Sequence, residues 1–105
     1  MSIFLEIMKE ELERNLFKQD AFLQQLNELP KGYLSECVID GKSYVYRKRR
    51  EGNKILSQYI GVIGDNKVKE AEEQREKYLQ LKESLKAIKK DELRLRKAIK
   101  EYEKL

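Results

Sequence analysis

The stretch Tyr44-Val45-Tyr46-Arg47-Lys48-Arg49-Arg50 decides the fold of the middle of this chain, because a turn signal stands on each side of it. Asp40-Gly41 precedes the stretch and favours a two-residue type I′ turn, since both residues tolerate positive φ. Gly52-Asn53 follows it and offers a second hairpin turn with glycine in the first central position. Residues 33–63 therefore predict a three-stranded antiparallel β-meander whose middle strand carries four consecutive cations.

The two turns also predict the register of the sheet. If both are two-residue loops, Tyr46 lies opposite Ser35 on the first strand and opposite Tyr59 on the third. Side chains then alternate between the two faces. One face carries Tyr33, Cys37, Ile39, Tyr44, Tyr46, Lys48, Arg50, Ile55 and Tyr59, and the other carries Leu34, Val38, Val45, Arg47, Arg49, Leu56 and Ile60.

The buried face has to be chosen between these two sets, neither of which is purely apolar. We expect the aliphatic residues to pack on the helices: Leu34, Val38, Val45, Leu56 and Ile60. The tyrosines then face outward at least in part. The alternative is that the tyrosines cover the edge of a core and leave only their hydroxyl groups in water.

A long helix is predicted before the sheet, over residues 1–29. Apolar residues recur there near helical spacing: Leu5, Met8, Leu12, Leu16, Leu23, Leu26 and Leu29, with Ile3, Phe4, Phe17 and Phe22 broadening the stripe. Ser2 is placed to cap the start of this helix. Pro30 disfavours the helical conformation of the residue before it, so Leu29-Pro30-Lys31-Gly32 marks the end.

A second long helix, coiled-coil-like, is predicted over residues 66–104, with Gly64-Asp65-Asn66 as its capping signal. Its apolar residues form a heptad seam on alternating steps of three and four: Tyr78, Leu81, Leu85, Ile88, Leu95, Ile99 and Tyr102. Glu92 interrupts the seam at an a position. The flanking e positions are all basic: Arg75, Lys82, Lys89 and Arg96.

These elements predict one α+β domain spanning residues 1–105, in which the long C-terminal helix packs antiparallel on the N-terminal helix. Leu79, Leu93 and Leu105 lie off the main seam, so we expect a further helix partner and favour a homodimer through the C-terminal helices. The alternative is a monomeric hairpin whose distal end frays.

The composition excludes most catalytic chemistry. The chain has no histidine and one cysteine, Cys37, so it has neither an internal disulfide nor the usual zinc or histidine-based sites. We expect no enzyme activity, no cofactor, no metal and no catalytic residue. The longest apolar run, residues 3–5, is too short to span a membrane, and a reducing compartment, the cytoplasm, fits best.

The cation cluster is the remaining candidate for function, since the net charge of +4 suits an anionic partner. The residues predicted to contact a nucleic acid or another partner are Lys42, Tyr44, Tyr46, Arg47, Lys48, Arg49, Arg50, Lys54 and Tyr59. Alternation sends Arg47 and Arg49 to one face and Lys48 and Arg50 to the other, so strong twist is needed to gather them. The alternative is a solvated charge run that protects the sheet from aggregation.

The pattern of residues 29–61 resembles a module of small bacterial and mobile-element proteins. Its parts are Leu29-Pro30-Lys31-Gly32, Gly41-Lys42-Ser43-Tyr44-Val45-Tyr46, Arg50-Glu51-Gly52-Asn53-Lys54 and Tyr59-Ile60-Gly61. It is also similar to the three-stranded arm-type DNA-binding modules of phage and transposon integrases. The resemblance implies a compact β-meander that touches DNA. It does not imply recombination, because no recombinase domain follows.

Three functions remain open at this point. The first is a dimeric nucleic-acid-binding accessory protein of a prokaryote or phage. The second is a protein-binding inhibitor, either an antitoxin or a phage anti-defence protein that acts on a nuclease or toxin. The third is a structural coiled-coil adaptor.

Overall fold

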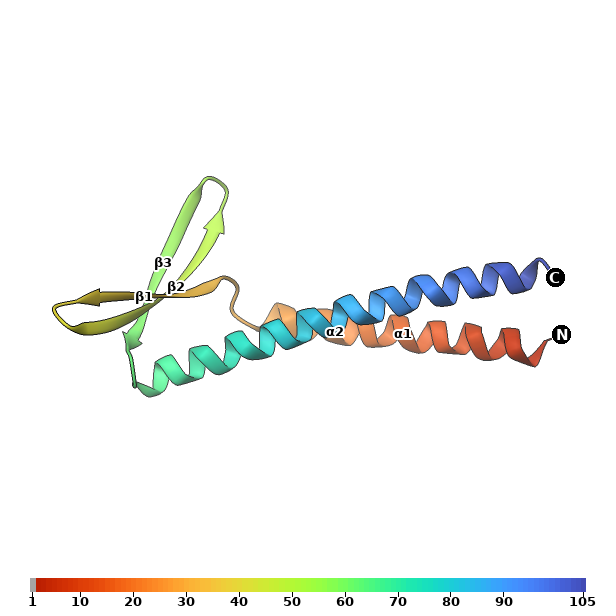
Figure 1. The fold of residues 1–105 in the computed structure, drawn as a ribbon, viewed down its shortest axis with the longest axis horizontal. Helices are drawn as coiled ribbons and strands as arrows, with labels where there is room; N and C mark the ends of the chain where they lie inside the picture. Colours follow the sequence, from red (N-terminus) through yellow and green to blue (C-terminus); the bar gives the residue numbers. More distant parts are fainter. Residues whose placement is uncertain (1) are drawn as a thin grey trace. The chain divides into compact units, whose positions relative to one another are not determined.

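The fold is α+β, as predicted. A computed structural model describes residues 2–105 and contains, in chain order, α1 (Ile3–Glu28), β1 (Tyr33–Ile39), β2 (Lys42–Glu51), β3 (Lys54–Val62) and α2 (Asn66–Glu103) (Figure 1). The chain divides into two compact units. Residues 2–28 and 80–105 form a helical unit, and residues 29–79 form a sheet unit that includes the first turns of α2.

The three strands form one antiparallel sheet in the order β1-β2-β3, so β2 is the central strand. The predicted register is confirmed, since Tyr46 pairs with Ser35 on β1 and with Tyr59 on β3. Asp40 and Gly41 have φ values of 50° and 79°, as a type I′ turn requires. At the second turn Gly52 has a φ of 62°. The β1–β2 and β2–β3 hairpins point in different directions in Figure 1.

A β-bulge between Val45 and Tyr46 separates these two hairpins. On one side of it Tyr46 pairs with Tyr59, whereas on the other side Val45 pairs with Gly61, which leaves Ile60 as the extra residue of β3. Bulges increase the local twist of a sheet and bend the bulged strand. The bulge therefore explains why β2 serves two hairpins that point in different directions.

The first turns of α2 cover one face of the sheet around Val45 and Gly61. Val45, Val68 and Ala71 are the buried apolar residues here, with Val68 only 1% exposed. The backbone of Gly61 lies so close to α2 that a Cβ atom added to it would be 3.3 Å from Cγ2 of Val68. We call this the reverse face of the sheet.

The expectation that five aliphatic residues pack on the helices holds only around Val45. Leu34 and Ile60 are half-buried, but Val38 is 65% exposed and Leu56 is 39% exposed, so for these two the expectation was wrong. The reason is the twist, which carries the two hairpin ends away from the covered centre of the reverse face.

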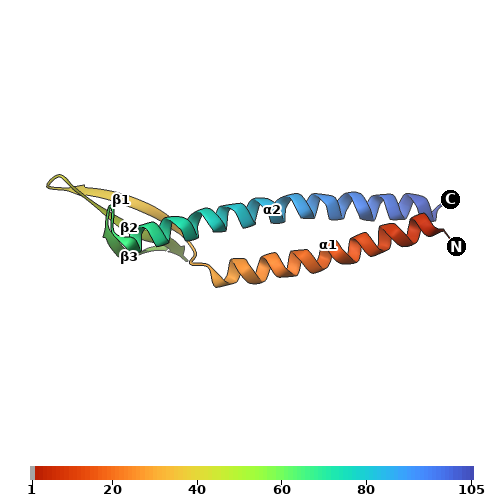
Figure 2. The same cartoon turned by 90° about the horizontal axis from the view of Figure 1, so that it is seen from below.

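In the helical unit, α1 and the C-terminal part of α2 run antiparallel and side by side, so both chain ends lie at the same end of the unit (Figures 1 and 2). Ser2 caps α1 as predicted, because its Oγ accepts a hydrogen bond from the backbone N–H of Leu5 at 3.4 Å. The ring of Phe4 stacks on that of Tyr102 with their centroids 5.9 Å apart, and Ser2 donates a hydrogen bond to the Tyr102 hydroxyl. These contacts join the start of α1 to the end of α2.

The apolar stripe of α1 differs from the predicted one. The buried residues of this helix are Asn15, Gln19 and Leu26, whereas the predicted stripe residues Leu16 and Leu23 lie at its exposed margin. Two amides outside the predicted stripe, Asn15 and Gln19, are therefore buried, whereas two of its leucines are not. Within residues 2–105 no helix is apolar over a stretch long enough to cross a membrane.

Candidate nucleic-acid interface

The face of the sheet opposite α2, which we call the open face, carries a cluster of three tyrosines. The ring centroids of Tyr46 and Tyr59 are 5.5 Å apart in an edge-to-face arrangement, and those of Tyr44 and Tyr59 are 6.3 Å apart. Both separations lie in the range of favourable aromatic pairs. Tyr59 is 53% exposed, and Tyr44 and Tyr46 are half-buried by their neighbours in the cluster.

Two lysines and a further tyrosine share the open face with this tyrosine cluster. Lys48 shares the face, because it pairs with Tyr33 on β1 and is two residues from Tyr46. Tyr33 is itself 47% exposed. Lys42 begins β2 on the same face and is exposed at the end of its hairpin. Lys54, which begins β3, is exposed at the end of the other hairpin, where it pairs with Glu51 and belongs by alternation to the reverse face. The open face thus combines aromatic rings with positive charge and no covering element within its own unit.

The other cations of the cluster gather at two hollows, with the help of a residue that the sequence reasoning did not select. One hollow, of about 360 Å³, is lined by Pro30, Lys31, Arg47, Arg49, Leu56, Ser57 and Gln58. A second, of about 280 Å³, is lined by Lys31, Gly32, Arg49, Arg50 and Glu51. Lys31 and Arg49 belong to both, so the two hollows adjoin. Arg49 thus neighbours Arg47 in one hollow and Arg50 in the other, while Lys48 stays on the open face.

The contribution of Lys31 follows from the strand register. Tyr33 pairs with Lys48 at the start of β1, so continuing the register backward places Lys31 across from Arg50. Gly32 allows this approach, because its φ is +109° and an added Cβ would be 2.3 Å from the carbonyl oxygen of Lys48. The guanidinium of Arg75 donates a hydrogen bond to the carbonyl oxygen of Gly32 and lies over the ring of Tyr78, 5.5 Å from its centroid.

Existing ion pairs of the cluster are weak. Arg49 lies 3.6 Å from the carboxylate of Glu51, and both side chains are more than half exposed. Exposed pairs of this kind contribute little, because water screens them. Arg47 donates a hydrogen bond of 3.4 Å to the Gln74 side-chain oxygen. Neither contact prevents these arginines from binding an anion.

The predicted heptad seam of α2 faces α1 along the helical unit. Leu85 is buried, and Leu81, Ile88, Leu95, Ile99 and Tyr102 are half-buried. Tyr78 is half-buried too, but lies in the sheet unit beneath Arg75. Most residues of the seam therefore pack against α1 of the same chain.

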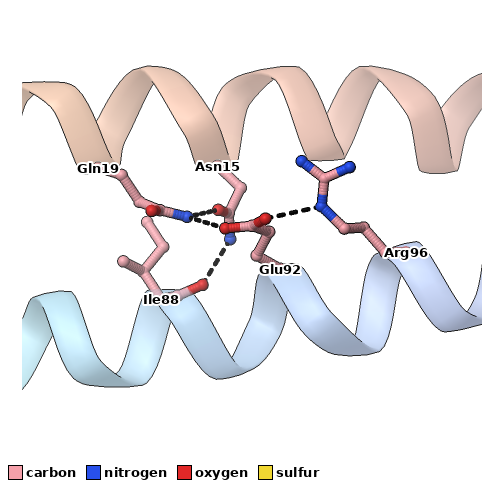
Figure 3. Close-up of polar contacts among 5 residues, drawn as sticks. All are labelled: Asn15, Gln19, Ile88, Glu92 and Arg96. Carbon is pink, nitrogen blue, oxygen red and sulfur yellow. Dashed lines mark hydrogen bonds and ion pairs between the residues drawn. The ribbon is translucent and has the colours of Figure 1, made fainter.

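The break in the seam at Glu92 is filled by a polar layer (Figure 3). Gln19 donates hydrogen bonds to Asn15 Oδ1 at 2.7 Å and to Glu92 Oε1 at 2.8 Å, and Asn15 donates to the carbonyl oxygen of Ile88 at 2.8 Å. Arg96 donates to the second oxygen of Glu92 at 2.6 Å. The hydrogen bond from Gln19, and next that from Arg96, lowers the pKa of Glu92 below its ordinary value. Only the Glu92 half of this layer was visible as a break in the heptads.

Comparison with known proteins adds no identification, since no protein-family model, curated protein or solved structure matches this chain. Within residues 2–105 no three histidine, cysteine or carboxylate side chains are grouped as a metal site would require. Cys37 is exposed. The tyrosine cluster and the adjoining cations are therefore the strongest candidate site in the described chain.

Proposed function

We propose that this chain is a non-enzymatic nucleic-acid-binding accessory protein of a prokaryote or phage that uses its basic, tyrosine-rich sheet. The observation that carries the proposal is the open face, where the rings of Tyr44 and Tyr46 both pack against that of Tyr59, beside Lys48. Aromatic side chains stack on bases of any sequence, and cations neutralise the phosphates between them. The resemblance of residues 29–61 to arm-type DNA-binding modules supports the same function.

The position of the four cations on β2 argues against the alternative that they serve only to prevent aggregation of the sheet. Such charges protect a sheet when they lie on an edge strand, where unpaired backbone groups are exposed. Arg47, Lys48, Arg49 and Arg50 lie on β2, which is paired on both sides. Their concentration on the central strand is better explained by an anionic ligand.

Removal of single rings from the open face tests the proposal. Tyr59→Val and Tyr44→Val keep a β-branched residue suited to a strand but remove the stacking surface. Stacking is worth about 1–3 kcal/mol per base, so each variant should bind labelled oligonucleotides roughly 5- to 150-fold more weakly in fluorescence anisotropy. Because the chain has six tyrosines and no tryptophan, bound bases should also quench its intrinsic fluorescence.

Phe17→Val is the matched control, because Phe17 is an aromatic residue that is 76% exposed on α1, outside the sheet unit. It should leave binding unchanged. Replacement of Arg47, Lys48, Arg49 and Arg50 together by alanine should abolish binding to polyanions without reducing the helical circular dichroism signal. Affinity equal to that of the wild-type chain in this fourfold variant would remove the cluster from the mechanism.

A protein-binding inhibitor is the second candidate, and the exposed apolar side chains of α1 favour it. Ile3, Ile7 and Phe17 are between 52% and 76% exposed on one helix. Under this alternative Phe17→Val, and not the tyrosine variants, weakens capture of a nuclease or toxin. The two sets of variants therefore separate the candidates in one experiment.

A homodimer through the C-terminal helices belongs to the same proposal. The seam of α2 contacts α1 of its own chain, so a second copy would use the exposed residues off that seam, Leu79 and Leu93. Light scattering coupled to size exclusion should report twice the chain mass of 12.6 kDa, and Leu93→Glu should halve it. A wild-type chain that stays monomeric at high concentration would refute the proposed homodimer.

A further inference from the structure

The larger hollow on the reverse face of the sheet has the lining of an anion site. Arg47 and Arg49 alternate with open-face residues along β2, and their cross-strand partners Gln58 and Leu56 are on β3. Together with Lys31 the hollow has three cations, and its lining among the described residues includes no carboxylate. Gln58 adds a side-chain amide that can donate hydrogen bonds, whereas Ser57 pairs with Lys48 and its side chain points to the open face.

A phosphate group suits this donor set. Guanidinium groups bind phosphate oxygens through paired N–H donors, and a lysine adds a point charge. The hollow, at about 360 Å³, exceeds the volume of one phosphate and leaves room for the attached sugar. The weak pair of Arg49 with Glu51 is a small competing interaction.

The hollow and the tyrosine cluster are joined across the free edge of β3. This strand is at the edge of the sheet, and its consecutive residues Gln58 and Tyr59 point to opposite faces. Gln58 lines the hollow, whereas Tyr59 is the exposed centre of the tyrosine cluster. A flexible strand that stacks a base on Tyr59 can therefore cross this edge and place a following phosphate near Gln58.

Resting on the proposed function, we infer that the ligand is a single-stranded nucleic acid whose bases stack on the open face and whose backbone crosses β3 to seat a phosphate between Arg47, Arg49 and Lys31. A duplex does not fit this path, because its persistence length of about 150 base pairs prevents it from turning around one strand. The stacked bases of a duplex also do not expose their faces to the tyrosines.

The double variant Arg47→Gln/Arg49→Gln tests the phosphate seat. Binding of a labelled single-stranded oligothymidine is measured by anisotropy at several salt concentrations, with a duplex of the same length in parallel. A single strand contributes about 0.7 to the slope of log affinity against log salt per neutralised phosphate, so loss of the one seated phosphate lowers the slope by about 0.7. The control Lys86→Gln/Lys97→Gln removes the same charge from exposed sites of α2 in the helical unit and leaves the slope unchanged.

The outcomes separate this inference from the proposed function. If the single strand binds and the tyrosine variants weaken it, but the slope of Arg47→Gln/Arg49→Gln equals that of the control, the phosphate seat is wrong and the open face stands. Equal affinity of duplex and single strand would overturn the assignment to single strands. Absence of binding by the wild-type chain to either probe would refute both the function and the seat.

Discussion

Replacement of Gly32 by alanine tests how the sheet unit positions its cations. An alanine Cβ at this position would lie 2.3 Å from the carbonyl oxygen of Lys48 and 3.1 Å from Cβ of Arg49, on a backbone with a φ of +109°. The oxygen belongs to the backbone of the central strand, so it can move only if β2 moves. The variant must therefore displace the segment before β1 or break the first pair of the β1–β2 ladder, Tyr33 with Lys48.

The cost has two parts that the structure identifies. Strain at a positive φ costs on the order of 1–3 kcal/mol, and loss of the charged hydrogen bond from Arg75 to the Gly32 carbonyl costs about 1.5–3 kcal/mol. We expect destabilisation of roughly 2.5–6 kcal/mol in Gly32→Ala. For a chain of this size the melting temperature should fall by at least about 10 °C. The transition is followed by near-ultraviolet circular dichroism, because the sheet carries four of the six tyrosines.

Gly64→Ala is the matched control for this experiment. Gly64 also has a positive φ, +95°, but no atom lies within 4 Å of the Cβ that would be added. Its cost should therefore be the backbone strain alone. If both variants lose the same stability, the contact of Gly32 with β2 and the bond from Arg75 do not hold this segment, and the reasoning is refuted.

Two further predictions concern the helical unit. Leu85→Asp places an unpaired charge at a buried seam position and should lower the melting temperature of the helical signal strongly, whereas Ser84→Asp, at an exposed site of the same helix, should not. Equal melting temperatures of the two variants would show that the seam is not packed. The second prediction concerns pH. Because the folded pKa of Glu92 is lowered from its ordinary value of 4.5, its carboxylate stabilises the fold fully above pH 4.5, and this contribution is lost as the pH falls through the folded pKa. Glu92→Gln should therefore reduce the difference in melting temperature between pH 7 and pH 3, and an unchanged difference would exclude Glu92 as one of its sources.

Much of the candidate site followed from local sequence rules. Asp40-Gly41 and Gly52-Asn53 specify tight turns through residues that tolerate positive φ, and two such turns specify the pairing of Tyr46 with Ser35 and Tyr59. The heptad spacing of α2 likewise predicts the residues that face α1, because helical periodicity is a property of the segment itself.

Other features depend on contacts between residues distant in the sequence, and only the tertiary structure decided them. The bulge at Val45 and Tyr46 divides the sheet into a covered centre and exposed ends. The residue pattern of the strands does not predict this bulge. Asn15 and Gln19 are buried on α1 because they find hydrogen-bond partners on α2, the carbonyl oxygen of Ile88 and the carboxylate of Glu92. Lys31 joins Arg47, Arg49 and Arg50 because Gly32 permits close approach to β2. Local patterns specify dihedral angles and periodicity, whereas the grouping of charges and polar side chains is set by which segments meet.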